Sequence, residues 1–221
     1  MHYQDLLFDL DETLFDFKAC EQRALHVIFE RYNIEFTKEL MECYSRINHH
    51  MWHEYEFGNV TREEVLDKRF RLTFQELGIK GIADSFEEEY QDELANGAMM
   101  KEGALEAVKH LSENHRLYVV SNGVATTQYA RLHASGLYPF FEAYFISEEV
   151  GYQKPQIEFM EYVKAHIPGF DQSAALLIGD SEASDIQGAV NLGIHSCIIG
   201  GKSALATYEI SRLDELFDFV D

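Results

Sequence analysis

The sequence from residue 103 onward alternates short apolar runs with longer segments of helical pattern, and this alternation constrains the fold more than any other feature. Apolar runs of this length predict buried strands, and the segments between them predict helices. Strands are expected at 6–8, 117–120, 144–146, 175–178 and 196–199, and helices at 103–114, 125–135, 156–166 and 185–192. Strands and helices that alternate with short connections are typical of the α/β class, with a doubly wound, mostly parallel sheet.

Residues 17–100 interrupt this alternation, because they carry helical patterns and no strong strand signal. Helices are expected at roughly 18–32, 37–56, 61–77 and 85–94. The third has a capping box, Thr61 with Glu64, and is followed by Gly78, a residue that favours a helix end. We therefore expect a catalytic core formed by residues 1–16 and 101–221, with residues 17–100 as an inserted helical domain over the strand ends.

The composition excludes several classes of partner. The 221 residues include 39 acidic and 18 basic ones, a net charge of −21, whereas a nucleic-acid or anionic membrane surface attracts basic proteins. The three cysteines form no CxxC pair, which favours reduced thiols. The sequence starts without a signal-peptide pattern and contains no apolar run near the ~20 residues of a membrane helix, so we expect a cytoplasmic protein.

Polar side chains follow the expected strands at corresponding places. Asp9 and Asp11 follow the first strand, Ser121 the second and Asp180 the fourth, while Lys154 lies in the loop after the third. Each has an ordinary interpretation as a turn or surface residue, and the Asp9–Asp11 spacing alone suits an Asp-rich turn equally well. Together they indicate a site, because a parallel sheet brings these strand ends to one edge.

The chemistry that these residue types suit is phosphoryl transfer. Three acidic groups can hold a hard cation such as Mg²⁺. A carboxylate can attack phosphorus and form an aspartyl phosphate, while a lysine and a hydroxyl stabilise the transferring group.

Four segments resemble, in order, the motifs of the haloacid dehalogenase-like (HAD) superfamily: DLDET from Asp9, SNG from Ser121, KP at Lys154 and GDSEASD from Gly179. The resemblance implies a Rossmann-like sheet of strand order 5-4-1-2-3. It also implies that the helical insertion is a C1-type cap, which closes over the site and selects the substrate.

The resemblance also implies roles for the acidic residues. Asp9 would be the nucleophile, and Asp11 the general acid for alcohol departure and then the base for water attack. Asp9, the carbonyl of Asp11 and Asp180 would ligate Mg²⁺. Asp185 would join them or orient their water.

For the phosphoryl group, the resemblance implies binding by Ser121 and Lys154, with help from the backbone amide of Asn122. One departure is Glu182-Ala183 in the fourth motif, where relatives often carry Leu-Thr. These two positions are not expected to be ligands, so the departure bears on metal tuning and not on activity.

A finer resemblance is to the bacterial pyrimidine 5′-nucleotidases of this superfamily. It is carried by residues 121–155, by Ile47, Asn48 and Trp52 in the insertion, and by the tail TYEISRLDEL. It implies hydrolysis of nucleoside 5′-monophosphates as small-molecule substrates. We also expect a monomer or homodimer. Trp52 could stack on the base, although most aromatic residues of the insertion are more simply its core.

Other functions remain open at this stage. The rival within phosphatases is a sugar-phosphate or phosphoglycolate-type enzyme on the same core, and a mutase is a less favoured alternative. Dehalogenation is disfavoured because those relatives lack the carboxylate at the position of Asp11. A binding or regulatory module without turnover is disfavoured because all the chemical groups are present.

Overall fold

The computed structural model describes residues 3–81 and 84–220 of the chain. It divides into two compact units, which we call the core unit (Met1–Ala19 with Ala98–Asp221) and the helical unit (Cys20–Gly97). The boundaries expected from the sequence, after residues 16 and 100, lie within three residues of these limits. Among the described helices, none is both long and apolar enough to cross a membrane.

The core unit contains a parallel sheet in the order β3-β2-β1-β4-β5-β6. The predicted order 5-4-1-2-3 is confirmed, and a short sixth strand extends it beyond β5. The strands are β1 (Asp5–Phe8), β2 (Arg116–Ser121), β3 (Ala143–Ile146), β4 (Ala175–Gly179), β5 (His195–Ile199) and β6 (Tyr208–Ile210). Since β1 lies in the middle, it pairs with β2 on one side and β4 on the other.

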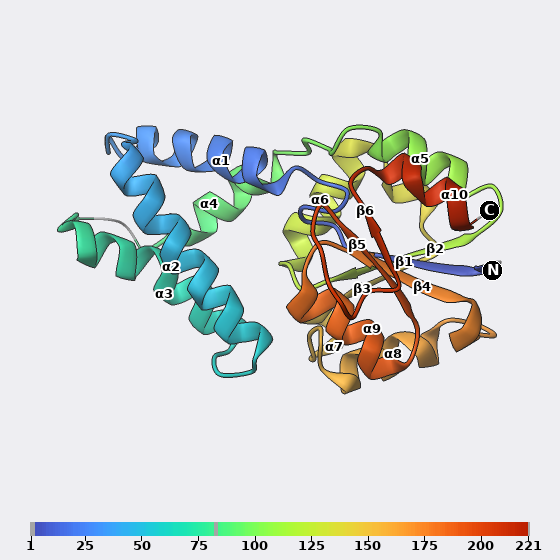
Figure 1. Cartoon of the computed structure of the whole chain (residues 1–221). Coiled ribbons are helices and arrows are strands. Elements are labelled where there is room, and N and C mark those ends of the chain that lie inside the picture. Colours follow the sequence, from blue (N-terminus) through green and yellow to red (C-terminus); the bar gives the residue numbers. More distant parts are fainter. Residues whose placement is uncertain (1–2, 82–83, 221) are drawn as a thin grey trace. The chain divides into compact units, whose positions relative to one another are not determined.

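Helices cover both faces of this sheet (Figure 1). Leu6 and Phe8 face the helices α5 and α6, whereas Leu7 faces α8 and α9, because successive side chains of a strand point to opposite faces. The helices of the core unit are α5 (Ala104–Leu111), α6 (Ala125–Ser135), α7 (Ser147–Val150), α8 (Ile157–His166), α9 (Gln187–Leu192) and α10 (Phe217–Val220). The helix predicted at 185–192 is α9 preceded by a π-helical turn, Glu182–Ile186.

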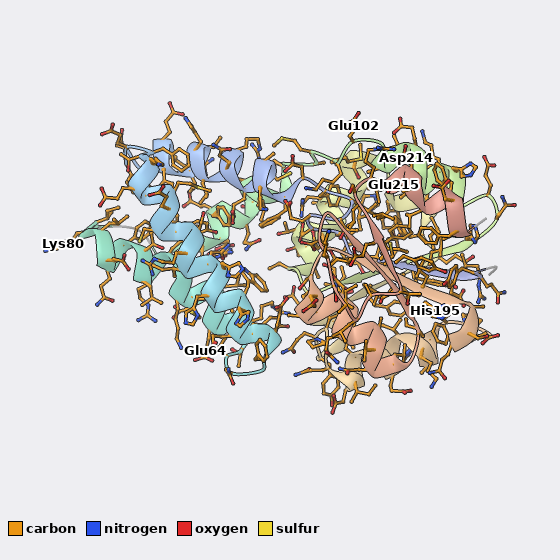
Figure 2. The ribbon with its side chains drawn as sticks, in the orientation of Figure 1. Glu64, Lys80, Glu102, His195, Asp214 and Glu215 are labelled. Carbon is orange, nitrogen blue, oxygen red and sulfur yellow. The ribbon has the colours of Figure 1, made fainter. Side chains whose placement is uncertain are left out.

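The helical unit is built from α1 (Phe17–Arg31), which begins in the core unit, α2 (Lys38–Glu56), α3 (Arg62–Leu77) and α4 (Phe86–Ala95). The predicted capping box of α3 is present: the Glu64 backbone N–H donates to Thr61 Oγ1 at 3.2 Å, and the Thr61 N–H donates to the Glu64 carboxylate at 3.0 Å. Glu64 lies in the first turn of this helix (Figure 2). Gly78 ends this helix in the left-handed conformation, with φ of 68°.

A buried polar network joins the four helices, with one residue from each. Asn48 of α2 donates to Glu21 of α1 at 3.0 Å and accepts from Arg69 of α3 at 3.1 Å. Arg69 also forms a two-pronged ion pair with Glu87 of α4. We call these four residues the helix network. Because each member contacts at least one other helix, the network specifies how the four helices pack.

Candidate active site

The loop after β1 places Asp9 and Asp11 in different surroundings. The Asp9 N–H donates to the Ile178 carbonyl at 2.9 Å, which continues the pairing with β4 and keeps the Asp9 side chain buried. The chain then turns sharply at Glu12, which has a φ of 62°, in the left-handed region. The Asp11 side chain is 30% exposed and faces α6. The two carboxylates therefore face different neighbours.

Lys154 lies at the centre of the site and is buried. Its ammonium group donates to Asp9 Oδ1 at 2.7 Å, to Asp185 Oδ1 at 2.6 Å and to the Val120 carbonyl at 2.9 Å. Asn122 holds the Lys154 backbone from both sides: its Oδ1 accepts from the Lys154 N–H at 2.8 Å, and its Nδ2 donates to the Lys154 carbonyl at 2.9 Å. The Asn122 side chain thus positions Lys154, a contact that the sequence analysis missed.

Asp180 and Asp185 follow β4. Asp185 is buried, and its second oxygen accepts from the Ser181 N–H at 3.0 Å. A side chain at Gly179 would place its Cβ 2.2 Å from Asp185 Oδ2, so only glycine allows this carboxylate to approach the strand end. Asp9, Asp180 and Asp185 each present an oxygen, and these oxygens lie within 4.8 Å of one another. We call these three residues the acidic cluster.

The acidic cluster holds more negative charge than Lys154 neutralises. Burial, together with the neighbouring carboxylates Asp185, Asp180 and Asp11, raises the pKa of Asp9 well above its ordinary value, although Lys154 opposes this. Burial and the charge of Asp185 raise the pKa of Asp180 to about 7. Burial alone would lower the pKa of Lys154, but Asp185 and Asp9 outweigh it and raise that pKa.

This arrangement fits a hard divalent cation. Carboxylate oxygens are the ligands that Mg²⁺ prefers, and a cation among three carboxylates relieves the repulsion between them. The acidic cluster contains Asp9 and Asp180, which were expected to bind the cation through their side chains, and Asp185, which was expected to join them or to orient their water. Asp11 was expected to bind through its carbonyl, and its side chain is turned toward α6.

Ser121 ends β2, is buried, and contacts a residue that the sequence analysis did not select. Its Oγ accepts from Gln128 Nε2 at 3.0 Å, and Gln128 also donates to Asp11 Oδ2 at 2.7 Å. Arg131, one helical turn along α6, donates to Asp11 Oδ1 at 2.5 Å. The spacing of Gln128 and Arg131 on a predicted helix shows that they share a face, but the sequence carries no signal that this face is buried.

A cleft of about 400 Å³ opens in the core unit beside Asp180. Its lining mixes the cations Lys18, Lys101 and Arg212 with the carboxylates Glu12 and Glu102. Lys101 donates to Glu12 at 2.8 Å. The cations of this cleft offset part of the negative charge at this edge of the sheet.

Trp52 lies in the helical unit and is half-buried. It packs against an apolar cluster that includes Ile47 and Tyr55, and its ring meets that of Tyr55 edge-to-face at 5.6 Å. Part of this ring is thus structural, and its expected contact with substrate stays a prediction.

Comparison with known proteins places this site in a family. The profile of the haloacid dehalogenase-like hydrolases matches residues 6–199, which include every residue of the acidic cluster. The chain belongs to the haloacid dehalogenase-like hydrolase family. This membership accounts for the parallel sheet and for the order in which the polar residues follow its strands.

Three named relatives match nearly the whole chain. The HAD-hydrolase YfnB of Bacillus subtilis is 38% identical over 99% of this chain and 96% of its own. Its crystal structure, with bound magnesium, superposes with a TM-score of 0.96 over 100% of this chain and 99% of that one. The pyrimidine 5′-nucleotidases PynA of Streptococcus pneumoniae and YjjG of Escherichia coli are 33% and 28% identical, over 100% and 98% of this chain and 96% and 97% of their own.

Proposed function

We propose that this hydrolase is a Mg²⁺-dependent phosphomonoesterase that acts through an aspartyl-phosphate intermediate, with nucleoside 5′-monophosphates, pyrimidine ones above all, as substrates. The observation that carries the proposal is the position of Asp9, whose carboxylate is held by Lys154 inside an acidic cluster suited to a divalent cation. The relatives support the choice of substrate, because two full-length matches are pyrimidine 5′-nucleotidases.

In this proposal Asp9 is the nucleophile. Its Oδ1 is bound to Lys154, so Oδ2 is the atom that attacks phosphorus. The bond from phosphorus to the ester oxygen breaks, and Asp11 donates a proton to the departing oxygen. Asp11 then takes a proton from the water that attacks the aspartyl phosphate, which releases inorganic phosphate and regenerates the Asp9 carboxylate.

Mg²⁺ held by Asp9 and Asp180, with the Asp11 carbonyl and Asp185, would offset the negative charge of the phosphoryl oxygens. The protein's own groups do the rest of the binding. Ser121 donates its hydroxyl hydrogen to a phosphoryl oxygen, and the Asn122 backbone amide donates beside it. Lys154 already has three acceptors, so a phosphoryl oxygen that binds its ammonium group replaces one of them.

The helical unit is assigned as the cap that selects the substrate. Residues 17–100, predicted as the insertion, contain the half-buried Trp52, whose exposed part we assign to stacking on the pyrimidine base. The Trp52→Leu variant should then raise KM for deoxy-UMP severalfold while leaving kcat for a small generic phosphomonoester unchanged. Equal KM values of wild type and Trp52→Leu for deoxy-UMP would contradict this assignment.

The deciding experiment is phosphate release from deoxy-UMP with Mg²⁺ and with chelator. We expect turnover only with Mg²⁺, and loss of turnover in Asp9→Asn. Asp67→Asn, which removes an exposed carboxylate of α3, is the matched control and should behave as wild type. Activity retained in Asp9→Asn would overturn the assigned nucleophile.

Two further measurements separate the alternatives. A panel of nucleotides, sugar phosphates and phosphoglycolate compares kcat/KM, and a clear preference for a non-nucleotide would overturn the substrate assignment in favour of the sugar-phosphate or phosphoglycolate class. Binding of BeF₃⁻ to wild type and not to Asp9→Asn is expected of an enzyme that forms an aspartyl phosphate. A binding module without turnover would bind no BeF₃⁻ at Asp9.

A further inference from the structure

Gln128 connects two groups to which the proposed function gives different tasks. It lies on α6, is only 1% exposed, and its Nε2 donates both to Ser121 Oγ and to Asp11 Oδ2. An amide nitrogen carries two hydrogens, so these two contacts use both. One buried side chain thus sets the distance between the phosphate-binding hydroxyl and the proposed acid and base.

The contacts of Ser121 determine where its hydroxyl hydrogen points. A serine oxygen can accept two hydrogen bonds and donate one. Ser121 Oγ accepts from Gln128 at 3.0 Å and from the Gly123 N–H at 3.2 Å, which fills both acceptor positions. The hydrogen is therefore directed away from these two groups, and it is available to a phosphoryl oxygen.

Arg131 fixes the orientation of the Gln128 amide. Its Nη1 donates to Gln128 Oε1 at 3.0 Å and to Asp11 Oδ1. An arginine can only donate, so it selects the amide oxygen and leaves the nitrogen to face Asp11. The guanidinium of Arg131 also lies over the ring of Phe15 at 4.3 Å, which ties the segment after Asp11 to α6.

Gly123 shows that the backbone makes room for this arrangement. A Cβ on Gly123 would lie 2.4 Å from Gln128 Nε2 and 2.9 Å from its Cδ. No other residue allows Gln128 to pass beside the turn and reach Ser121. The glycine of the SNG motif is thus explained by the approach of a side chain, and this observation is independent of the hydrogen bonds.

We propose that Gln128, locked by Arg131, is a positioning residue that aims the Ser121 hydroxyl at the phosphoryl group and fixes the Asp11 carboxylate for proton transfer. This inference rests on the proposed phosphomonoesterase function and extends it to two residues outside the four motifs. It predicts that Gln128 acts on the chemical step and not on the acidic cluster, because it contacts none of Asp9, Asp180 and Asp185 in any hydrogen bond that the structure shows.

The test compares Gln128→Met and Gln128→Glu with wild type in steady-state kinetics on deoxy-UMP. We expect Gln128→Met, which removes all three hydrogen bonds at similar volume, to lower kcat by about 100-fold. The rise in Tm on adding Mg²⁺ should stay as in wild type, since the acidic cluster is intact. Gln75→Met, an exposed glutamine of α3, is the matched control and should change neither quantity.

Gln128→Glu has nearly the same shape and gives a readout that a merely structural role would not. It places a second carboxylate beside Asp11, and two carboxylates in contact share a proton, so the pH profile of kcat should shift to higher pH. Arg131→Lys should lower kcat less than Gln128→Met, because the shorter point charge keeps one contact at most.

The outcomes separate this inference from the proposed function. An active wild type whose kcat and pH profile survive Gln128→Met and Gln128→Glu would overturn the positioning role alone. Loss of kcat together with loss of the Mg²⁺-dependent rise in Tm would also overturn it, since the variant would then have disturbed the acidic cluster. A wild type that hydrolyses no phosphomonoester would overturn the proposed function and the role of Gln128 with it.

Discussion

Two buried polar clusters in this chain use the same kinds of groups to opposite effect. In the helix network, Arg69 finds Glu87 on one side and Asn48 on the other, and its guanidinium lies 4.9 Å from the centre of the Tyr90 ring. In the core unit, Lys154 faces the three carboxylates of the acidic cluster, and the pKa of Asp180 rises to about 7. The helix network sets two carboxylates against one guanidinium, whereas the core unit sets three carboxylates against one ammonium group, so the excess of negative charge is larger at the acidic cluster.

The two clusters therefore have different roles in the protein. A buried ion pair whose donors all find acceptors specifies how helices pack, and removing one partner leaves a charge without compensation. A cluster of like charges costs stability until a ligand of opposite charge arrives. Removing a carboxylate from the acidic cluster should therefore stabilise the metal-free fold, whereas removing the cation of the helix network should destabilise it.

The largest effect is expected for Asp180→Asn on turnover. With one ligand of the acidic cluster lost, phosphate release should fall by about 1,000-fold, or about 4 kcal/mol of transition-state stabilisation. The Tm of the metal-free protein at pH 8 should nevertheless rise, because the variant carries less repulsion. A lower Tm without metal would contradict the reading of the cluster as a charge excess.

Next comes Arg69→Met, which should lower the free energy of unfolding by about 3 kcal/mol, because Glu87 loses its cation and the buried Asn48 loses a donor. Adding Mg²⁺ should not restore the lost free energy of unfolding. Arg71→Met, whose ion pair with Asp67 is exposed, is the control and should change stability by less than about 1 kcal/mol. Denaturant titration of the three proteins measures both values, and equal stability of the two variants would show that the helix network is not structural.

A smaller effect is expected in the pH dependence of metal binding. A carboxylate whose pKa is raised to about 7 in the folded state stabilises the fold fully below its unfolded value of about 4, and this contribution is lost as the pH rises through 7. Mg²⁺ competes with that proton, so the rise in Tm on adding Mg²⁺ should be a few degrees larger at pH 8 than at pH 5.5. Thermal melts of wild type and Asp180→Asn at both pH values measure how much the Mg²⁺-dependent rise in Tm changes with pH. This change should be much smaller in Asp180→Asn than in wild type.

The smallest effect is expected for Thr61→Ala at the start of α3. Loss of one half of the capping box should lower the free energy of unfolding by about 1 kcal/mol, with Mg²⁺ affinity unchanged. Thr126→Ala, on the exposed side of α6, is the control without a capping role. A change in Mg²⁺ affinity in Thr61→Ala would show that the start of α3 is coupled to the acidic cluster.

Much of the core unit could be predicted, because a strand buried on both faces of a parallel sheet is a continuous apolar run that stands out in the sequence. The strands β2 and β4 were predicted in this way. Because parallel strands end at one edge of the sheet, Asp9, Ser121 and Asp180 were expected to meet there. The strand β6 was missed because Tyr208–Ile210 is only three residues long and lies at the sheet edge, where the Glu209 side chain is exposed.

Gln128 and Arg131 could not be predicted, for a physical reason that applies to any amphipathic helix. A polar residue at helical spacing normally faces solvent, and nothing in the local sequence distinguishes the rare face that turns inward. Their burial depends on Asp11 and Ser121, which are distant in sequence and which supply the acceptors that make a buried amide and guanidinium tolerable.

Most of the elements, the parallel sheet and the edge at which the acidic residues gather could be predicted, because they follow from local apolar patterns and from the alternation of strands and helices. Which carboxylates share a cluster, and which one is held apart, depends on the tertiary structure. Asp185 joins Asp9 and Asp180 through the space left by Gly179, and Asp11 turns to α6, because hydrogen bonds and burial between distant segments set the direction of a side chain.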